Sequence, residues 1–100
     1  MERLALTARL RPDTRDDAER LIREGPPFDP HDLGFDRHSV YLSAEEVVFV
    51  FEGGDVERLV SALANDPARA AAFAAWGPIV AETPRLAHEV YSWERTGPET

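Results

Sequence analysis

The feature that most constrains the fold of this chain is the run Val47-Val48-Phe49-Val50-Phe51, in which every residue is β-branched or aromatic. Such residues favour β-strands, and the run lies between a turn near Ala44-Glu45 and the pair Gly53-Gly54. Because its side chains alternate between two faces and are apolar on both, this strand is typical of the middle of a covered sheet. The sequence therefore predicts a central strand over 47–51 with a covering layer on each face.

Three further segments alternate between apolar and other residues, and they predict the remaining strands of the sheet. Residues 3–11 carry leucine or alanine at every second position, and Pro12 ends this alternation. Residues 39–43 alternate in the same way and form a hairpin with the central run. The last strand is predicted over 86–94. Its two sides carry Leu86, His88 and Val90, and Ala87, Glu89, Tyr91 and Trp93.

The first helix is predicted after Pro12, with Asp13 or Thr14 as its side-chain cap. Residues 25–37 contain three prolines and have no periodicity, so they form a loop. Within this loop, Leu33 and Phe35, together with Phe28, are expected to lie against the body of the domain.

The second helix is predicted over 56–65, where apolar residues recur at helical spacing and Asp55 serves as the cap. A short alanine-rich helical segment follows over 66–77, and it carries Phe73 and Trp76. Two helical pieces therefore separate the hairpin from the last strand.

The order of elements is β-α-β-β-α-β, and 100 residues is the length of one domain. We predict a single α+β domain over 1–95, a ferredoxin-like sandwich with an antiparallel four-stranded sheet, and a tail over 96–100. In this topology the first and third strands are central and both helices cover one face. The other face would be apolar and aromatic, so we expect a partner, most simply a second copy, to cover it. Its side chains include Ala5, Thr7, Tyr41, Tyr91 and Trp93.

The charge balance excludes several classes of partner. The formal net charge is -8, from 19 acidic and 11 basic residues, and the arginines are scattered along the chain. We therefore expect neither nucleic acid nor an anionic membrane as a partner. No cysteine is present, which excludes disulfides and thiolate chemistry. We see no signal peptide and no apolar run of membrane-spanning length, and we expect a cytoplasmic protein.

Residues 6–14, 47–53, 55–60 and 63–67 carry a resemblance to known proteins. With this order of elements, the chain resembles the dimeric α+β barrel proteins. More narrowly, it resembles the SchA/CurD-like family of small proteins encoded beside aromatic polyketide pathways. The resemblance implies a homodimer in which two sheets pack face to face and small molecules bind between sheet and helices. The matching stretches are structural patterns and do not select a reaction.

Two histidines are candidate catalytic residues. His38 begins the second strand, where it could carry a proton near pH 7 or polarise a ligand carbonyl; the alternative is a surface histidine. His88 lies on an apolar strand face, and it could project into a pocket or be a core histidine satisfied by hydrogen bonds. In the catalytic hypothesis, Tyr41 or Tyr91 assists the histidine.

Aromatic side chains are candidates for binding a flat aromatic or polyketide-like ligand, because large apolar walls with a few polar tips suit such molecules. The alternative is that they pack the core and a dimer interface. The candidate ligand-binding residues are Phe49, Trp76, Tyr91 and Trp93, with Tyr41 beside them.

The acidic loop and the start of the next strand supply oxygen and nitrogen groups that could bind a metal, but their spacing matches no standard set of ligands. These groups are Asp29, His31, Asp32, Asp36 and His38. A solvated acidic loop explains them equally well, so we predict no metal and no cofactor. Haem is a further alternative, with His31, His38 or His88 as the axial ligand.

These observations support three hypotheses. The first is a small dimeric accessory enzyme or ligand-binding protein that resembles aromatic polyketide biosynthesis proteins and assists cyclisation or oxidation. The second is a non-enzymatic homodimeric binding or interaction module, and the third is a haem-dependent monooxygenase. A fully packed interior would favour the second, whereas a cavity with a histidine and a tyrosine near one point would favour catalysis.

Overall fold

The computed structural model describes residues 2–25, 29–67 and 74–95 of the chain. Its elements follow the order β-α-β-β-α-β, with a single 3-10 turn before the last strand. They are β1 (Glu2–Arg9), α1 (Arg15–Arg23), β2 (Arg37–Leu42), β3 (Glu46–Gly53), α2 (Val56–Asn65), η1 (Ala74–Trp76) and β4 (Arg85–His88). All strand pairs are antiparallel, which confirms the predicted α+β fold class.

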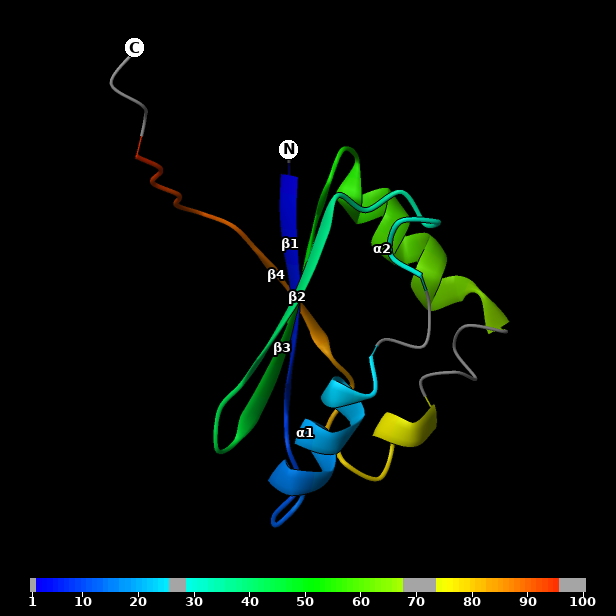
Figure 1. Ribbon diagram of the computed structural model, residues 1–100, viewed down its shortest axis with the longest axis vertical. Helices are drawn as coiled ribbons and strands as arrows, with labels where there is room; N and C mark the ends of the chain where they lie inside the picture. Colours follow the sequence, from blue (N-terminus) through cyan, green and yellow to red (C-terminus); the bar gives the residue numbers. More distant parts are fainter. Residues whose placement is uncertain (1, 26–28, 68–73, 96–100) are drawn as a thin grey trace.

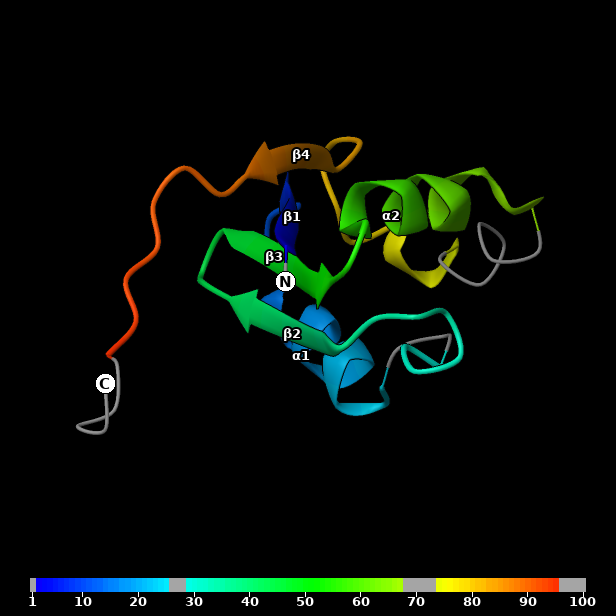
Figure 2. The same cartoon turned by 90° about the horizontal axis from the view of Figure 1, so that it is seen from above.

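The sheet has the strand order β2-β3-β1-β4, so β3 and β1 lie in its middle; Figure 1 shows the sheet nearly edge-on, and Figure 2 shows the order of its strands. Phe51 of β3 is opposite Leu4 of β1 on one side and opposite His38 of β2 on the other. On the far side of β1, Leu4 is opposite His88 of β4. The run over 47–51 is therefore a central strand, as its composition predicts.

Both helices lie on one face of the sheet, and the described residues place no helix or strand over the other (Figure 2). We call these the helix face and the open face. Leu4, Ala8 and Phe51 point to the helix face and are at most 2% exposed. The core between sheet and helices is formed by Leu4, Phe35, Phe51, Val56 and Val60, with Leu6, Leu33, Phe49 and Leu59 packed against it.

The loop before β2 closes the core from one end. Phe35 is 5% exposed, and its ring centroid lies 4.9 Å from that of Phe51. The Asp36 amide donates to the Glu52 carbonyl at 2.7 Å, which fixes the end of the loop to the sheet. The prediction that this loop lies against the domain is therefore confirmed for Leu33 and Phe35, while Phe28 lies outside the described residues.

The two helices begin where predicted, but neither is capped by a side chain. Thr14 and Asp55 occupy the N-cap positions of α1 and α2 without a capping hydrogen bond. A side-chain cap normally needs an extended backbone at this position, whereas Asp55 is left-handed with φ 55°. Its carboxylate instead accepts from Arg58 Nε at 2.7 Å, and the Thr14 hydroxyl donates to the Arg11 carbonyl at 2.7 Å.

β4 is shorter than the predicted strand over 86–94, because it ends at His88. The physical reason is the register. His88 is opposite Leu4, so Arg3 and Glu2 of β1 remain opposite Glu89 and Val90, and β1, which begins at Glu2, offers no partner for 91–94. Residues 89–95 continue past this end of the sheet without strand pairing.

The predicted helical segment over 66–77 is described only in part. Its last turn is η1, and Phe73 lies outside the described residues, as does the predicted tail over 96–100. Among the described helices, none has both the length and the apolar character needed to cross a membrane.

Candidate functional site

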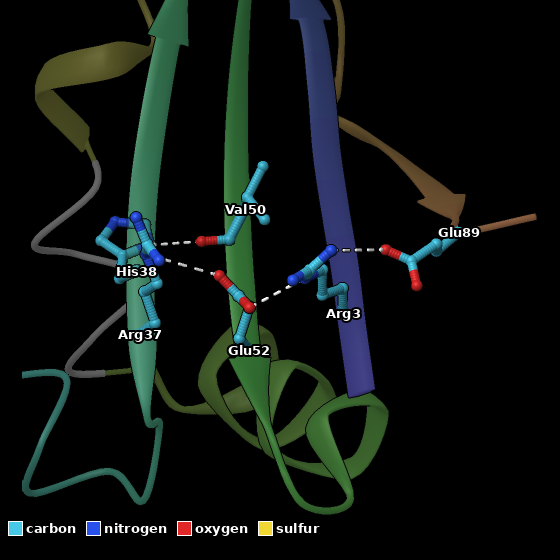
Figure 3. A network of polar contacts seen from close by, with 6 residues as sticks. All are labelled: Arg3, Arg37, His38, Val50, Glu52 and Glu89. Atoms are coloured by element: carbon cyan, nitrogen blue, oxygen red, sulfur yellow. Dashed lines mark hydrogen bonds and ion pairs between the residues drawn. The ribbon is translucent and has the colours of Figure 1, made fainter. Parts of the chain in front are cut away.

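His38 is the most chemically distinctive residue on the helix face. Its imidazole is half-buried and stacks on the ring of Phe51, with centroids 4.5 Å apart and planes 24° from parallel. Nδ1 lies 3.0 Å from the Val50 carbonyl oxygen (Figure 3). Because a carbonyl can only accept, this hydrogen bond assigns the proton of the neutral ring to Nδ1 and the lone pair to Nε2.

Burial lowers the pKa of His38 below its ordinary value of 6.5, and the hydrogen bond to the Val50 carbonyl opposes this shift. Burial acts in this direction because removing water disfavours the charged imidazolium. The neutral ring is therefore the favoured form near neutral pH. A neutral imidazole with its lone pair on Nε2 is chemically a base.

Aromatic rings extend this environment along the sheet. Phe49, two residues before Phe51 on β3, points to the same face. Its ring meets that of Trp76 on η1 edge to face, with centroids 5.2 Å apart and an interplanar angle of 83°. The structure thus brings together three of the predicted site residues, His38, Phe49 and Trp76, on one side of the sheet.

His88 lies in the same row of the sheet as His38 but at the opposite edge. The row runs from His38 through Phe51 and Leu4 to His88. Three strand spacings of about 4.8 Å each place these two histidines about 14 Å apart. His88 is exposed, so within one subunit the two histidines cannot act on the same atom of a small molecule.

The remaining predicted site residues lie away from His38. Tyr41 is opposite Val48 and alternates with Val40, so it points to the open face, where it is 61% exposed. Tyr91 and Trp93 follow β4 and are 75% and 71% exposed. The predicted set is therefore divided among the helix face, the open face and the segment after β4.

The open face carries a charge network that the sequence analysis missed. Arg3 Nε donates to Glu52 Oε1 at 2.8 Å, and Arg3 Nη1 lies 3.3 Å from Glu89 Oε2. Arg37 Nε lies 3.6 Å from the other oxygen of Glu52. The network crosses the whole sheet, from β2 to the residue after β4 (Figure 3). We call it the arginine–glutamate ladder.

Glu52 is the centre of the ladder. It is only 6% exposed although it lies on the open face, so its charge needs partners, and the two arginines provide them. The hydrogen bond and the charge of Glu52 raise the pKa of Arg3 above its ordinary value. The signal that would have revealed the ladder is register: Arg37, Glu52 and Arg3 are directly opposite one another across three strands.

A second charged cluster lies at the other end of the open face. Arg9 Nε and Arg85 Nη2 each lie 3.1 Å from an oxygen of Glu82. The hydrogen bond from Arg9 lowers the pKa of Glu82 below its ordinary value. Between the two clusters the open face is mostly small, apolar or aromatic, with Ala5, Thr7, Tyr41, Val48, Val50 and Ala87.

A shallow hollow of about 250 Å³ lies beside the ladder. Ala5, Val50 and Ala87 form one row across three strands and supply its apolar floor. The full lining consists of Arg3, Leu4, Ala5, Val50, Ala87, His88 and Glu89.

The predicted alternatives of a metal or haem find limited support in the donor groups. Among the residues that the structure describes, no three His, Asp or Glu side chains are placed to share a metal ion. The side chain of His31 is 95% exposed and lies beside Asp32, and His88 is exposed at the sheet edge. These two do not fit an axial haem ligand, which needs an apolar slot; only His38 has an apolar setting.

No protein-family model matches the chain, and no curated protein matches it. Tetracenomycin F2 cyclase from Streptomyces glaucescens, a type-II polyketide cyclase, has a similar structure, with a TM-score of 0.68 and 18% identity; the match covers 96% of this chain and 100% of the cyclase. A protein from Chloroflexus aurantiacus, assigned as an antibiotic biosynthesis monooxygenase, matches with a TM-score of 0.50 and 18% identity, over 92% and 95% of the two chains. The chain therefore has the ferredoxin-like α+β fold that these two proteins share.

Proposed function

We propose that this chain is a homodimeric accessory enzyme of aromatic polyketide biosynthesis, close to the SchA/CurD-like family, that assists cyclisation with His38 as the proton-transfer group. The observation that carries the proposal is the setting of His38, a neutral imidazole held by a backbone carbonyl and stacked on an aromatic ring. The similarity in fold to a type-II polyketide cyclase supports the class of substrate.

In the proposed reaction, Nε2 of His38 removes a proton from a carbon between two carbonyl groups of the polyketide. The resulting enolate carbon attacks a ketone carbon of the same molecule and forms the new C–C bond. The imidazolium then returns the proton to the alkoxide oxygen, and later loss of water makes the ring aromatic. Phe49 and Trp76 would orient the flat substrate beside His38.

The proposal makes His38 the acid and the base in turn. Tyr41 lies on the other face of the sheet, and Tyr91 lies beyond the edge strand. Neither tyrosine is therefore assigned a catalytic role beside His38 in the same subunit. The lowered pKa of His38 keeps the imidazole neutral near pH 7, so that Nε2 can accept a proton, and it makes the resulting imidazolium a ready proton donor.

The test is turnover of tetracenomycin F2, the compound in the name of the structurally similar cyclase, followed by chromatography. His38→Gln should lower kcat by about 100-fold or more, while His88→Gln, the matched control at the other edge of the row, should stay close to wild type. Activity should also fall as the pH drops through the lowered pKa of His38. Wild-type turnover by His38→Gln would contradict the proposal.

The homodimer is supported by the composition of the open face. Its centre is small, apolar or aromatic, and ion pairs lie at both ends. A centre depleted of charge with a polar rim is the usual anatomy of a protein interface. Sedimentation velocity over a range of concentrations tests this part of the proposal.

A non-enzymatic binding module is the second candidate, and the packing around His38 favours it. Leu4, Phe35 and Phe51 are at most 5% exposed, and His38 stacks directly on this cluster. A histidine satisfied within a core is a common structural feature. Saturable binding of tetracenomycin F2 without turnover would support this candidate over the enzyme.

The monooxygenase alternative concerns haem. When bound, haem would supply oxygen activation, and only His38 has the apolar setting of an axial ligand. Absence of a Soret band after incubation with haem would exclude this alternative.

A further inference from the structure

Three rings from three parts of the chain stand next to one another on the helix face. The ring centroids of Phe35, in the loop before β2, and Phe51, on β3, lie 4.9 Å apart, with their planes 40° from parallel. The centroids of Phe51 and His38 lie 4.5 Å apart, at 24°. Both distances fall in the range of about 4.5–7 Å in which aromatic rings attract one another. We call these three rings the ring stack, and Phe51 is its middle member.

The sheet itself brings His38 and Phe51 together. The two residues are directly opposite in the β2–β3 register. The Ser43 amide donates to the Glu46 carbonyl at 2.9 Å, which continues the same register. Opposite residues of an antiparallel pair alternate between hydrogen-bonded pairs and closer, non-hydrogen-bonded pairs, so His38 and Phe51 form one of the closer pairs. The imidazole therefore lies over the gap between the two strands, where Nδ1 reaches the Val50 carbonyl at 3.0 Å.

The loop fixes the other end of the ring stack. The Phe35 amide donates to the Pro30 carbonyl and the Gly34 amide to the His31 carbonyl, both at 3.0 Å. With Gly34 in the left-handed region at φ 91°, this pair of hydrogen bonds is the Schellman arrangement that ends a helical turn. The next amide, that of Asp36, is bonded to β3 at 2.7 Å. Phe35 is therefore held on both sides along the chain, and its side chain is 5% exposed.

The orientation of the His38 ring depends on more than one restraint. The last torsion of a histidine side chain has two broad, roughly equivalent settings, and only one of them points Nδ1 at the Val50 carbonyl. Phe51 covers one face of the imidazole and restricts this rotation. Phe35 lies against Phe51 in turn and keeps that ring from moving away.

We propose that Phe35 is a positioning residue for His38: through Phe51, Phe35 and the turn that holds it keep the imidazole against the Val50 carbonyl, with Nε2 free to act as the base. This role rests on the proposed function, for which it names the residue that prepares His38. Phe35 acts by packing alone. Arg37 and Glu52, the charged neighbours of the ring stack along β2 and β3, belong to the ladder on the open face (Figure 3).

The first experiment follows the imidazole of His38 by nitrogen-15 NMR in Phe35→Leu, which stays apolar but removes a ring. The pKa of His38 should rise towards 6.5 as water reaches the imidazole, and the neutral form protonated at Nε2 should become populated. Ile79→Ala is the matched control, because Ile79 is also 5% exposed but lies outside the core cluster. An unchanged His38 in Phe35→Leu, or equal changes in both variants, would overturn the inference.

The second experiment disturbs the turn and leaves every ring in place. Ala at position 34 would be strained at φ 91°, while its Cβ would lie at an ordinary 3.6 Å from the Leu59 side chain. Gly25, after α1, has the same φ and open space around it, so Gly25→Ala carries the same strain away from the ring stack. Gly34→Ala should change His38 in the same direction as Phe35→Leu, and Gly25→Ala should leave it unchanged. The same response in both glycine variants would contradict the role of the turn.

Turnover of tetracenomycin F2 separates this inference from the proposed function. Phe35→Leu should lower kcat about threefold to tenfold, with KM changed less than about twofold, because the base is misplaced while the binding surface remains. The fall of activity at low pH should also begin at a higher pH than in wild type. A lower kcat with an unmoved pKa and tautomer would overturn the positioning role and leave His38 as the base. A wild-type protein without turnover would overturn the proposed function, and the NMR comparison would still decide whether Phe35 orients His38.

Discussion

The two faces of the sheet differ in the charge state of their titratable side chains. On the helix face, His38 is the titratable group stacked on the core, and burial keeps it neutral near pH 7. On the open face, charges are retained and paired, with Glu52 between Arg3 and Arg37. In the proposed function, proton transfer belongs to the helix face and association of two copies to the open face, so the two can be changed separately.

The largest effect should come from the helix face. Phe51 is 2% exposed and contacts both Phe35 and His38, so Phe51→Ala should lower the free energy of unfolding by about 3–5 kcal/mol. Urea denaturation at low protein concentration measures this change.

The matched control is on the other face. Tyr41 is 61% exposed, so Tyr41→Ala should change the free energy of unfolding of the monomer by no more than about 0.5 kcal/mol. Equal losses in the two variants would show that the open face is as tightly packed as the core, against the account given above.

An intermediate effect is expected from the ladder. Glu52→Ala removes the partner of two arginines and should cost about 1–2 kcal/mol of unfolding free energy. The cost is moderate because the side chain of Arg37 is 70% exposed and can be hydrated once Glu52 is gone. Arg37→Ala should cost less than Glu52→Ala. It removes only the longer contact, 3.6 Å from Arg37 Nε to Glu52 Oε2, and leaves the 2.8 Å contact between Arg3 Nε and Glu52 Oε1 in place. The reverse order, measured by urea denaturation, would refute the central position of Glu52.

The central strand shows what the sequence could predict. The apolar composition of 47–51 predicts the central position of this strand, which the strand order confirms, whereas, among the described residues, the predicted cover is present on the helix face only. Element order and the helix starts follow from local signals of the same kind. The confirmed part of the fold is thus the part that depends on neighbouring residues in the chain.

The ladder and the length of β4 show what the sequence could not predict. Arg37, Glu52 and Arg3 meet only because of the register between strands far apart in the chain. The alternation over 86–94 continues beyond the point where β1 can pair with it, so pattern alone overestimates the strand. For the site, the predicted assistance of His38 by Tyr41 overlooked alternation, since residues three apart on one strand lie on opposite faces, and the distance between His38 and His88 depends on strand order.

The smallest effect is a dependence of stability on pH. The pKa of His38 is lowered in the folded chain, so as the pH falls through about 6.5 the unfolded chain binds a proton first. Stability should therefore decrease as the pH falls in this range. His38→Gln removes this contribution, and its unfolding free energy should fall less than that of wild type between pH 7 and pH 5. Parallel curves would argue against burial of His38.

The most direct test of the central claim is a nitrogen-15 NMR titration of His38, with His38→Gln used to assign the signals. The expected result is a neutral ring protonated at Nδ1, with the lone pair on Nε2, and a pKa below 6.5. A neutral ring protonated at Nε2, or a pKa at or above 6.5, would contradict the assignment of His38 as a neutral base on the helix face.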